Sequence, residues 1–166
     1  MVTDENLRDA FAGESQANHK YLAFARRAQQ EGLPQVARLF RAVAEAETVH
    51  ALAHLRAMKA VGSTVENLQE AVDGESFEYK EMYPRYVATA MDEGHKIAML
   101  SFHDAMAAEQ VHYGLYVEAL SCVRAGEDLP ERRVYVCSRC GNIVVDESPQ
   151  RCPICNAAQE KFREIQ

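Results

Sequence analysis

Residues 47–50 read Glu-Thr-Val-His, and residues 109–112 read Glu-Gln-Val-His. In each tetrapeptide the glutamate and the histidine are three residues apart, so on a helix both side chains project from one face. Both tetrapeptides lie in apolar stretches, and a buried carboxylate is costly unless it is paired, protonated or bound to metal. The pattern therefore predicts two helices that turn Glu47, His50, Glu109 and His112 towards a metal site.

The two tetrapeptides belong to a longer internal repeat. A shift of the sequence by 62 residues superimposes them without a gap and also superimposes rarer residues. These matches pair Tyr21 with Tyr83, Glu31-Gly32 with Glu93-Gly94, and Phe40 with Phe102. Chance similarity between two alanine-rich helices is the alternative, but the matches include uncommon polar residues. We expect two helical hairpins related by approximate two-fold symmetry.

Further carboxylates occur on the other two predicted helices. Glu14 lies on the first helix, and Glu75 and Glu78 lie on the third. One glutamate from each of two helices, together with Glu-x-x-His from each of the other two, is the ligand pattern of di-iron and di-manganese bundles. A single Glu-x-x-His is common on solvated helix faces, but two at a fixed offset with acidic partners favour metal. Mixed carboxylate and imidazole ligands suit iron or manganese better than zinc.

The helix boundaries follow from glycine, proline and capping residues. Gly32 suits the position just after a helix, and Pro34 suits a first helical turn. Thr64 is expected to cap the third helix, and Pro84 is expected to kink it. The predicted helices run from about 4 to 31, from 34 to 61, from 64 to the break at Gly94, and from there to Gly126.

The last part of the chain has a different composition and carries four of the five cysteines. Cys137-x-x-Cys140 and Cys152-Pro-x-Cys155 form two knuckles that can hold one ion tetrahedrally. A module of residues 134–166 is too small to fold on apolar burial alone, so metal should stabilise it. A zinc ribbon shares this spacing. Beside a di-iron bundle, a one-electron iron–thiolate centre is favoured, and zinc is the expected substitute on overproduction.

Composition narrows the function further. The formal net charge of −7 argues against nucleic acid as a partner. Residues 1–9 are polar and acidic, unlike a signal peptide, and no stretch is apolar enough to span a membrane. In such a chain the paired cysteines indicate metal or redox chemistry rather than disulfides. We therefore expect a cytoplasmic protein that binds neither nucleic acid nor membranes. Cys122, His19, His54, His95 and His103 lack a motif and are not expected to be ligands.

Two segments resemble the rubrerythrin family. They are residues 12–18, Ala-Gly-Glu-Ser-Gln-Ala-Asn, and residues 79–84, Tyr-Lys-Glu-Met-Tyr-Pro. The resemblance covers nearly the whole chain and implies an all-α ferritin-like four-helix bundle over residues 1–125. A linker over 126–133 and a small C-terminal rubredoxin-like β domain over 134–166 follow. Tyr135, Ile143 and Phe162 also resemble rubredoxin, although the absence of tryptophan departs from many rubredoxins.

The resemblance also implies ligands. The carboxylate ligands of the two irons would be Glu14, Glu47, Glu75, Glu78 and Glu109, with Glu47 and Glu109 as bridges. His112 would bind the second iron, and the first iron would move between Glu78 and His50 as the oxidation state changes. Cys137, Cys140, Cys152 and Cys155 would hold a third iron. Tyr21 and Tyr83 lie near these ligands, either as hydrogen-bonding or proton-transfer groups or as packed core residues.

The function implied is reduction of hydrogen peroxide to water. Electrons would pass through the four-cysteine iron, supplied by an NAD(P)H-linked reductase or a rubredoxin. One alternative is a ferritin-like iron-oxidising or iron-storage protein, which the cysteine tail argues against. The other is an interaction module stabilised by a zinc ribbon.

The connection between the second and third helices bears on assembly. In a ferritin-like bundle these helices run parallel, which needs a crossover of roughly 35 Å at about 1.5 Å per residue. Residues 62–64 alone reach about 10 Å. Exchange of the second hairpin with a partner chain resolves this, so we expect a homodimer. An unwound segment over residues 63–74 is the alternative.

Overall fold

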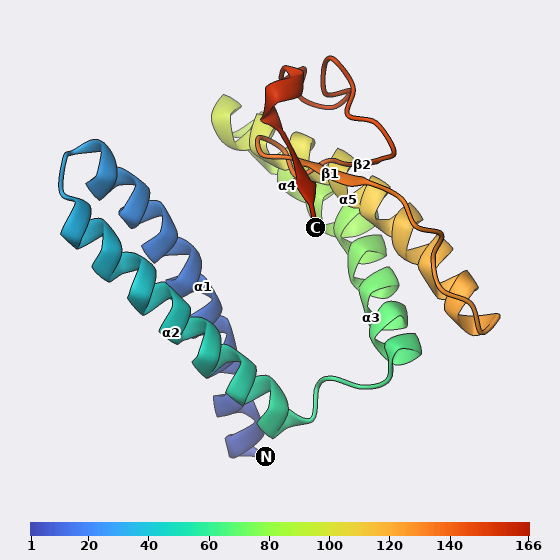
Figure 1. Ribbon diagram of the computed structural model, residues 1–166, viewed down its shortest axis with the longest axis horizontal. Helices are drawn as coiled ribbons and strands as arrows, with labels where there is room; N and C mark the ends of the chain where they lie inside the picture. Colours follow the sequence, from blue (N-terminus) through green and yellow to red (C-terminus); the bar gives the residue numbers. More distant parts are fainter. The chain divides into compact units, whose positions relative to one another are not determined.

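Helices occupy the chain as far as Arg124, and a small sheet follows (Figure 1). The computed structural model describes all 166 residues. By packing, the chain divides into two units, residues 1–62 and 63–166. No helix is sufficiently long and apolar to cross a membrane.

The first unit is a hairpin of α1 (Val2–Gln30) and α2 (Pro34–Met58). Its buried residues are all alanines, Ala25 and Ala28 on α1 and Ala37, Ala44 and Ala51 on α2. The α2 alanines recur every seven residues, so they form one stripe on which α1 can approach closely. Gly32 joins the helices with a φ of +76°, a left-handed conformation that suits glycine. The predicted helix boundaries here are correct to within three residues.

The second unit begins with α3 (Thr64–Phe77), whose N-cap lies one residue earlier than expected from sequence. Ser63, rather than Thr64, caps the helix: its Oγ accepts from the Glu66 N–H, and the Glu66 carboxylate accepts from the Ser63 N–H at 2.7 Å. The Glu66 carboxylate also accepts from the Ser63 hydroxyl at 2.7 Å, and this hydrogen bond, followed by the one from the Ser63 N–H, lowers the pKa of Glu66. Because the chain is helical from Thr64 onwards, the unwound segment considered as an alternative for residues 63–74 is absent.

A π-helical segment, Glu78–Met82, separates α3 from α4 (Tyr83–Asp92). The Tyr83 N–H donates to the Glu78 carbonyl five residues back. A kink centred on Pro84 was expected. Instead Pro84 lies in the first turn of α4, where its missing N–H is tolerated. The helical run packs against α5 (Lys96–Arg124), with Val72, Ala90, Ala108, Ala119 and Leu120 buried.

The π-helical segment coincides with a shift in the internal repeat. Gly13-Glu14-Ser15 matches Gly74-Glu75-Ser76 at an offset of 61, whereas Tyr21 matches Tyr83 at 62. From Tyr21 onwards the match needs no gap, as expected from sequence. Before Tyr21, the second hairpin contains one extra residue between the glutamate and the tyrosine. A π turn holds one more residue than an α turn, so it absorbs the extra residue and keeps Tyr83 in register with Glu75.

The C-terminal module is a three-stranded antiparallel sheet in the order β2-β1-β3. Its elements are β1 (Val134–Cys137), β2 (Ile143–Val145), a 3₁₀ turn (Gln159–Lys161) and β3 (Phe162–Ile165). The first two strands match the strand-like runs predicted from sequence, whereas β3 was not predicted. The buried core of the module consists of three cysteines and one alanine, namely Cys137, Cys152, Cys155 and Ala157. The cysteine side chains therefore occupy the position that larger apolar side chains fill in other domains.

Candidate metal centres

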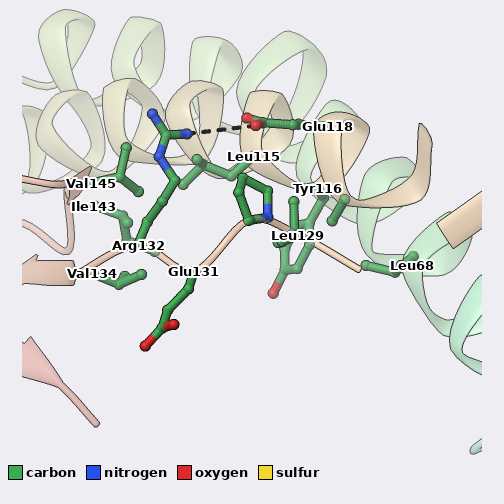
Figure 2. A pocket seen from close by; sticks show the side chains of 12 residues that line it. Leu68, Leu115, Tyr116, Glu118, Leu129, Glu131, Arg132, Val134, Ile143 and Val145 are labelled. Atoms are coloured by element: carbon green, nitrogen blue, oxygen red, sulfur yellow. Dashed lines mark ion pairs between the residues drawn. The ribbon is translucent and has the colours of Figure 1, made fainter. Parts of the chain in front are cut away.

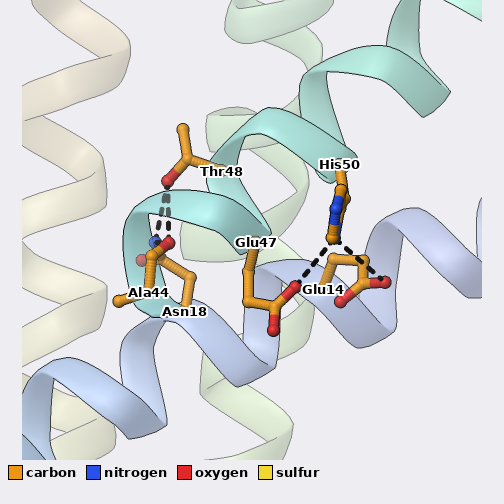
Figure 3. A network of polar contacts seen from close by, with 6 residues as sticks. All are labelled: Glu14, Asn18, Ala44, Glu47, Thr48 and His50. Atoms are coloured by element: carbon orange, nitrogen blue, oxygen red, sulfur yellow. Dashed lines mark hydrogen bonds and ion pairs between the residues drawn. The ribbon is translucent and has the colours of Figure 1, made fainter. Parts of the chain in front are cut away.

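The first cluster of donor atoms lies in the α1–α2 hairpin (Figure 3). His50 Nδ1 is 2.9 Å from Glu47 Oε2 and 4.0 Å from Glu14 Oε1. One ligand atom from each of the three residues lies within 4.8 Å of the other two. The His50 side chain is 56% exposed within this unit, whereas that of Glu47 is 15% exposed. The sequence-predicted ligands of the first hairpin therefore meet on one face of it.

The second cluster lies between α3 and α5 and is more buried. His112 Nδ1 is 2.6 Å from Glu109 Oε2 and 3.8 Å from Glu75 Oε2. Glu75 Oε2 is buried and has no hydrogen-bond partner. Burial, and then the neighbouring Glu109 carboxylate, raise the pKa of Glu75 to about 7. Both clusters thus have the same composition, two glutamates and one histidine.

Glu78 and Tyr83 border the second cluster. Burial raises the pKa of Glu78, and the Glu109 charge adds to this effect. Burial and the nearby carboxylates of Glu109, Glu78 and Glu75 also raise the pKa of Tyr83. Glu78 lies outside the compact donor group of Glu75, Glu109 and His112. It stands at the first position of the π-helical segment, so its backbone differs from that of its counterpart Ala17 in the regular helix α1.

The two tyrosines singled out from the sequence both lie in aromatic clusters. The Tyr21 ring lies 6.2 Å from those of Phe24 and Phe40, centroid to centroid. The Tyr83 ring lies 6.2 Å from Tyr86 and 6.3 Å from Phe102. Both tyrosines are half-buried, and Phe24 and Tyr86 are exposed, so these are aromatic contacts at the edge of each hairpin rather than in a buried core.

The second cluster fits a cation. Three donor groups crowd together, one buried carboxylate oxygen lacks a hydrogen bond, and oxygen with imidazole nitrogen suits iron. His112 Nε2 lies 3.0 Å from the Gly141 carbonyl oxygen. Donation from Nε2–H leaves the Nδ1 lone pair free to face the two carboxylates. Sequence reasoning missed this role of Gly141, because any residue type carries a backbone carbonyl.

The four paired cysteines form the third cluster. The Sγ atoms of Cys137 and Cys155 are 3.7 Å apart, and those of Cys140 and Cys152 are 3.6 Å apart. None of them forms a disulfide. Burial opposes ionisation of Cys152, but the Cys155 and Ile154 backbone N–H groups outweigh it and lower its pKa to about 7. All four sulfur atoms lie within 4.8 Å of one another, an arrangement that fits a single four-thiolate metal ion.

The remaining histidines and Cys122 belong to none of these donor groups. His95 is the N-cap of α5, where its Nδ1 accepts from the Ala98 N–H at 3.2 Å. His19 Nδ1 lies 2.8 Å from the Ser15 carbonyl on its own helix. Asn142 is a partner that sequence reasoning missed: it is buried, and its side-chain amide lies 3.9 Å from Cys152 Sγ.

Comparison with known proteins identifies relatives along the whole chain. The model of the rubrerythrin family matches residues 5–120, and that of the rubrerythrin rubredoxin-like domain matches residues 135–163. Rubrerythrin-2 of Clostridium acetobutylicum is 36% identical over 176 residues, covering 98% of this chain and 96% of that protein. Nigerythrin of Nitratidesulfovibrio vulgaris is 35% identical over 174 residues, covering 96% and 85%.

Solved structures give the same result. The fully reduced, all-ferrous state of nigerythrin has a TM-score of 0.58 and 33% identity, covering 98% of this chain and 86% of that one. The mixed-valence state of nigerythrin has a TM-score of 0.57 and 34% identity, with the same coverage.

These matches confirm the expected fold class, a ferritin-like helical part followed by a small rubredoxin-like module. They also confirm the cofactors expected from sequence, a di-iron carboxylate site and a four-cysteine iron site, in an oxidoreductase. Each hairpin carries one Glu-x-x-His pair, and four cysteines follow in the C-terminal module. Together with the matches along the chain, these features show that the chain belongs to the rubrerythrin family.

Proposed function

We propose that the chain reduces hydrogen peroxide to two waters, consuming two electrons and two protons. The observation that carries the proposal is the 3.0 Å contact between His112 and Gly141, which joins a carboxylate–histidine cluster to a cysteine knuckle. The carboxylate and histidine clusters would hold an iron pair able to supply two electrons to one O–O bond, and the four cysteines would hold an iron able to return electrons one at a time.

The ligands we propose for the iron pair are Glu14, Glu47, His50, Glu75, Glu78, Glu109 and His112, with Glu47 and Glu109 as bridges. The geometry of the two donor groups supports six of the seven, and Glu78 is supported by its electrostatic coupling to Glu109. We propose the four paired cysteines as ligands of the third iron. The Tyr83 phenol is protonated at neutral pH, and burial with the nearby carboxylates raises its pKa further, so we propose that it donates a hydrogen bond beside the carboxylates.

The proposed electron path runs through the C-terminal module. Gly141 directly follows Cys140, so a short covalent path leads from the Cys140 sulfur to the carbonyl that accepts from His112 Nε2. The imidazole then presents Nδ1 to the carboxylate cluster. Nigerythrin has been solved in mixed-valence and all-ferrous states, so the metal of that relative changes oxidation state. For this chain we propose an NAD(P)H-linked reductase or a rubredoxin as the electron donor, acting in the cytoplasm.

We also propose a homodimer with exchanged helical hairpins. Both hairpins leave large apolar side chains exposed, among them Leu39 and Leu52 on α2 and Ile97 and Leu100 on α5. Residues 59–63 connect α2 to α3 and reach about 20 Å when extended. A crossover along the length of α2 needs about 37 Å. The connection is therefore too short for a parallel arrangement within one chain.

Stopped-flow mixing tests the peroxidase proposal. Iron-loaded, fully reduced protein should be oxidised faster by hydrogen peroxide than by dioxygen at equal concentration, and should contain three irons per chain. His112→Gln should abolish the fast phase, whereas His103→Gln on the same helix should retain it. Faster oxidation by dioxygen, with iron accumulating beyond three per chain, would instead favour an iron-oxidising or storage role. Native protein that holds zinc without iron would favour the interaction module.

A further inference from the structure

Within the second unit, the cysteine module rests against α5 over an incompletely filled apolar space (Figure 2). The cavity measures about 510 Å³. It is lined by α3 and α5 residues (Leu68, Leu115, Tyr116, Glu118, Ala119), by linker residues (Leu129, Pro130, Glu131, Arg132) and by strand residues (Val134, Ile143, Val145). A close-packed interface resists sliding. A pocket of this size that opens to solvent leaves the position of the module against α5 weakly determined by apolar contacts.

Two polar contacts join the module and its linker to α5. At one end, His112 Nε2 meets the Gly141 carbonyl at 3.0 Å. At the other, the Arg132 guanidinium lies between two carboxylates: NH1 is 3.6 Å from Glu118 Oε1, and NH2 is 3.0 Å from Asp146 Oδ2. Arg132 Nε also donates to Asp146 at 3.2 Å. Because Asp146 directly follows β2, Arg132 connects the sheet to the helix.

The two contacts are separated along α5. His112 and Glu118 are six residues apart, which is about 9 Å along a helix axis. One contact alone would leave the module free to rotate about that point. A second contact at this distance leaves only rotation about the line that joins the two contacts, so it restricts the movement of the knuckle that carries Gly141.

We propose that Arg132 is a positioning residue for electron delivery, which holds the cysteine module so that the Gly141 carbonyl stays against His112. The inference rests on the proposed electron path and adds a residue to it. Arg132 touches neither donor cluster in the structure, so its effect is on the orientation of the module.

The solvent exposure of the two ion pairs that Arg132 forms with Glu118 and Asp146, called the clamp below, predicts how strongly they hold the module. The side chains of Arg132, Glu118 and Asp146 are 37%, 47% and 56% exposed, so salt screens their attraction. The clamp should therefore weaken at high ionic strength. An arginine can engage both carboxylates with its planar fork, whereas a lysine is a point charge and engages them less well.

Arg132→Gln, Arg132→Lys and the matched control Arg133→Gln test the proposal in iron-loaded protein. The control removes a neighbouring arginine whose guanidinium lies over the Tyr135 ring instead. After reduced protein is mixed with peroxide, oxidation of the four-cysteine iron is followed by its thiolate absorption band. Arg132→Gln should slow this oxidation about fivefold, as expected for loss of exposed ion pairs that bias one docked state. Arg132→Lys should be intermediate, and Arg133→Gln should match the wild type.

Two further readouts separate positioning from damage. The reduction potential of the four-cysteine iron and the KM for peroxide should be unchanged in Arg132→Gln, while kcat falls. Amide hydrogen exchange of the iron-loaded variant should increase around residues 137–142 and 112–118, and added salt should slow wild-type oxidation but not that of the variant. Unchanged exchange or an unchanged oxidation rate in Arg132→Gln would overturn the proposal. If the protein did not react with peroxide but Arg132→Gln still increased amide exchange, the positioning role of Arg132 would stand and only the peroxidase function would be contradicted.

Discussion

Asn18 on α1 is hydrogen-bonded to Thr48 on α2: its Nδ2 donates to Thr48 Oγ1 at 2.8 Å (Figure 3). The same nitrogen lies 2.6 Å from the Ala44 carbonyl oxygen. Asn18 is one turn from Glu14, and Thr48 directly follows Glu47. This side chain therefore sets how the two carboxylates face each other across the hairpin, in a unit whose buried core is made only of alanines.

Asn18→Ala should destabilise the metal-free hairpin and weaken metal binding together. Loss of two part-buried hydrogen bonds should lower the free energy of unfolding by about 1–2 kcal/mol. Urea unfolding followed by circular dichroism measures the first effect, and titration with Co²⁺ measures the second. Gln16→Ala, an exposed position on the same helix, is the control and should change neither. Wild-type stability in Asn18→Ala would show that the alanine stripe alone orders the hairpin.

Helix positions were predictable because glycines and prolines mark their ends. Gly32 and Gly94 both follow helices and both adopt positive φ. The π-helical segment was not predicted, because Pro84 offered a sufficient local reason for a break. Only a comparison of Glu14 with Glu75 and of Tyr21 with Tyr83 shows that the two hairpins differ by one residue. The proline was therefore a sufficient explanation by itself, and it hid the one-residue difference that only a comparison of the two hairpins reveals.

The extra residue, and not Pro84, should cause the π-helical segment. Pro84→Ala alone should leave residues 78–82 exchanging amide hydrogens faster than the flanking turns. Deletion of Glu81, an exposed residue of the segment, together with Pro84→Ala should give a regular helix with slower exchange there. In that variant Glu75 and Tyr83 are seven residues apart, as Glu14 and Tyr21 are in α1.

Deletion of Gln16 from α1 is the matched control for the loss of Glu81. Helix α1 has no extra residue to lose, so Glu14 should rotate by about 100° relative to Tyr21. First-hairpin metal binding should then be lost, which Co²⁺ titration would detect. If Pro84→Ala alone made the amides of residues 78–82 exchange as slowly as those of the flanking turns, the proline would be the cause of the π-helical segment.

Glu75 makes stability depend on pH in the metal-free protein. Its pKa is raised from an ordinary 4.5 to about 7, chiefly by burial and by Glu109. The folded chain therefore holds the proton more tightly than the unfolded chain. The contribution of this group is fully present below pH 4.5 and is lost as the pH rises through about 7. Urea unfolding midpoints of the metal-free protein should fall over this range, and Glu75→Gln should flatten the fall.

Metal reverses this dependence. Binding displaces the Glu75 proton, so affinity should rise by up to about tenfold per pH unit below pH 7. Glu70→Gln, an exposed position on α3, should retain both pH dependences of the wild type. Isothermal titration with Co²⁺ at pH 5.5, 6.5 and 7.5 is the measurement. Affinity that does not change with pH would mean that Glu75 is already ionised before the metal arrives.

The ligand types of the candidate sites could be predicted, but their supporting contacts could not. Glu47 and His50 follow from a helical spacing that sequence displays directly. The acceptor of His112 is a backbone carbonyl at Gly141, and the partner of Cys152 is Asn142, which no motif marks. Such contacts depend on how one segment folds against another. For the same reason sequence spacing did not place Arg132 between Glu118 and Asp146.

The cysteine module should unfold when its metal is removed, because Cys137, Cys152 and Cys155 make up most of its buried core. Cys155→Ser leaves three thiolates and one buried hydroxyl where a fourth ligand is needed, so iron content should fall from three to two per chain. Fast amide exchange across β1 and β3 would report the loss of the sheet, while the helices keep their circular dichroism. Cys122→Ser removes the unpaired thiol of α5 and should change neither iron content nor exchange. If Cys155→Ser kept a protected sheet, the few apolar contacts of Ile154 and Phe162 would suffice to fold the module without metal.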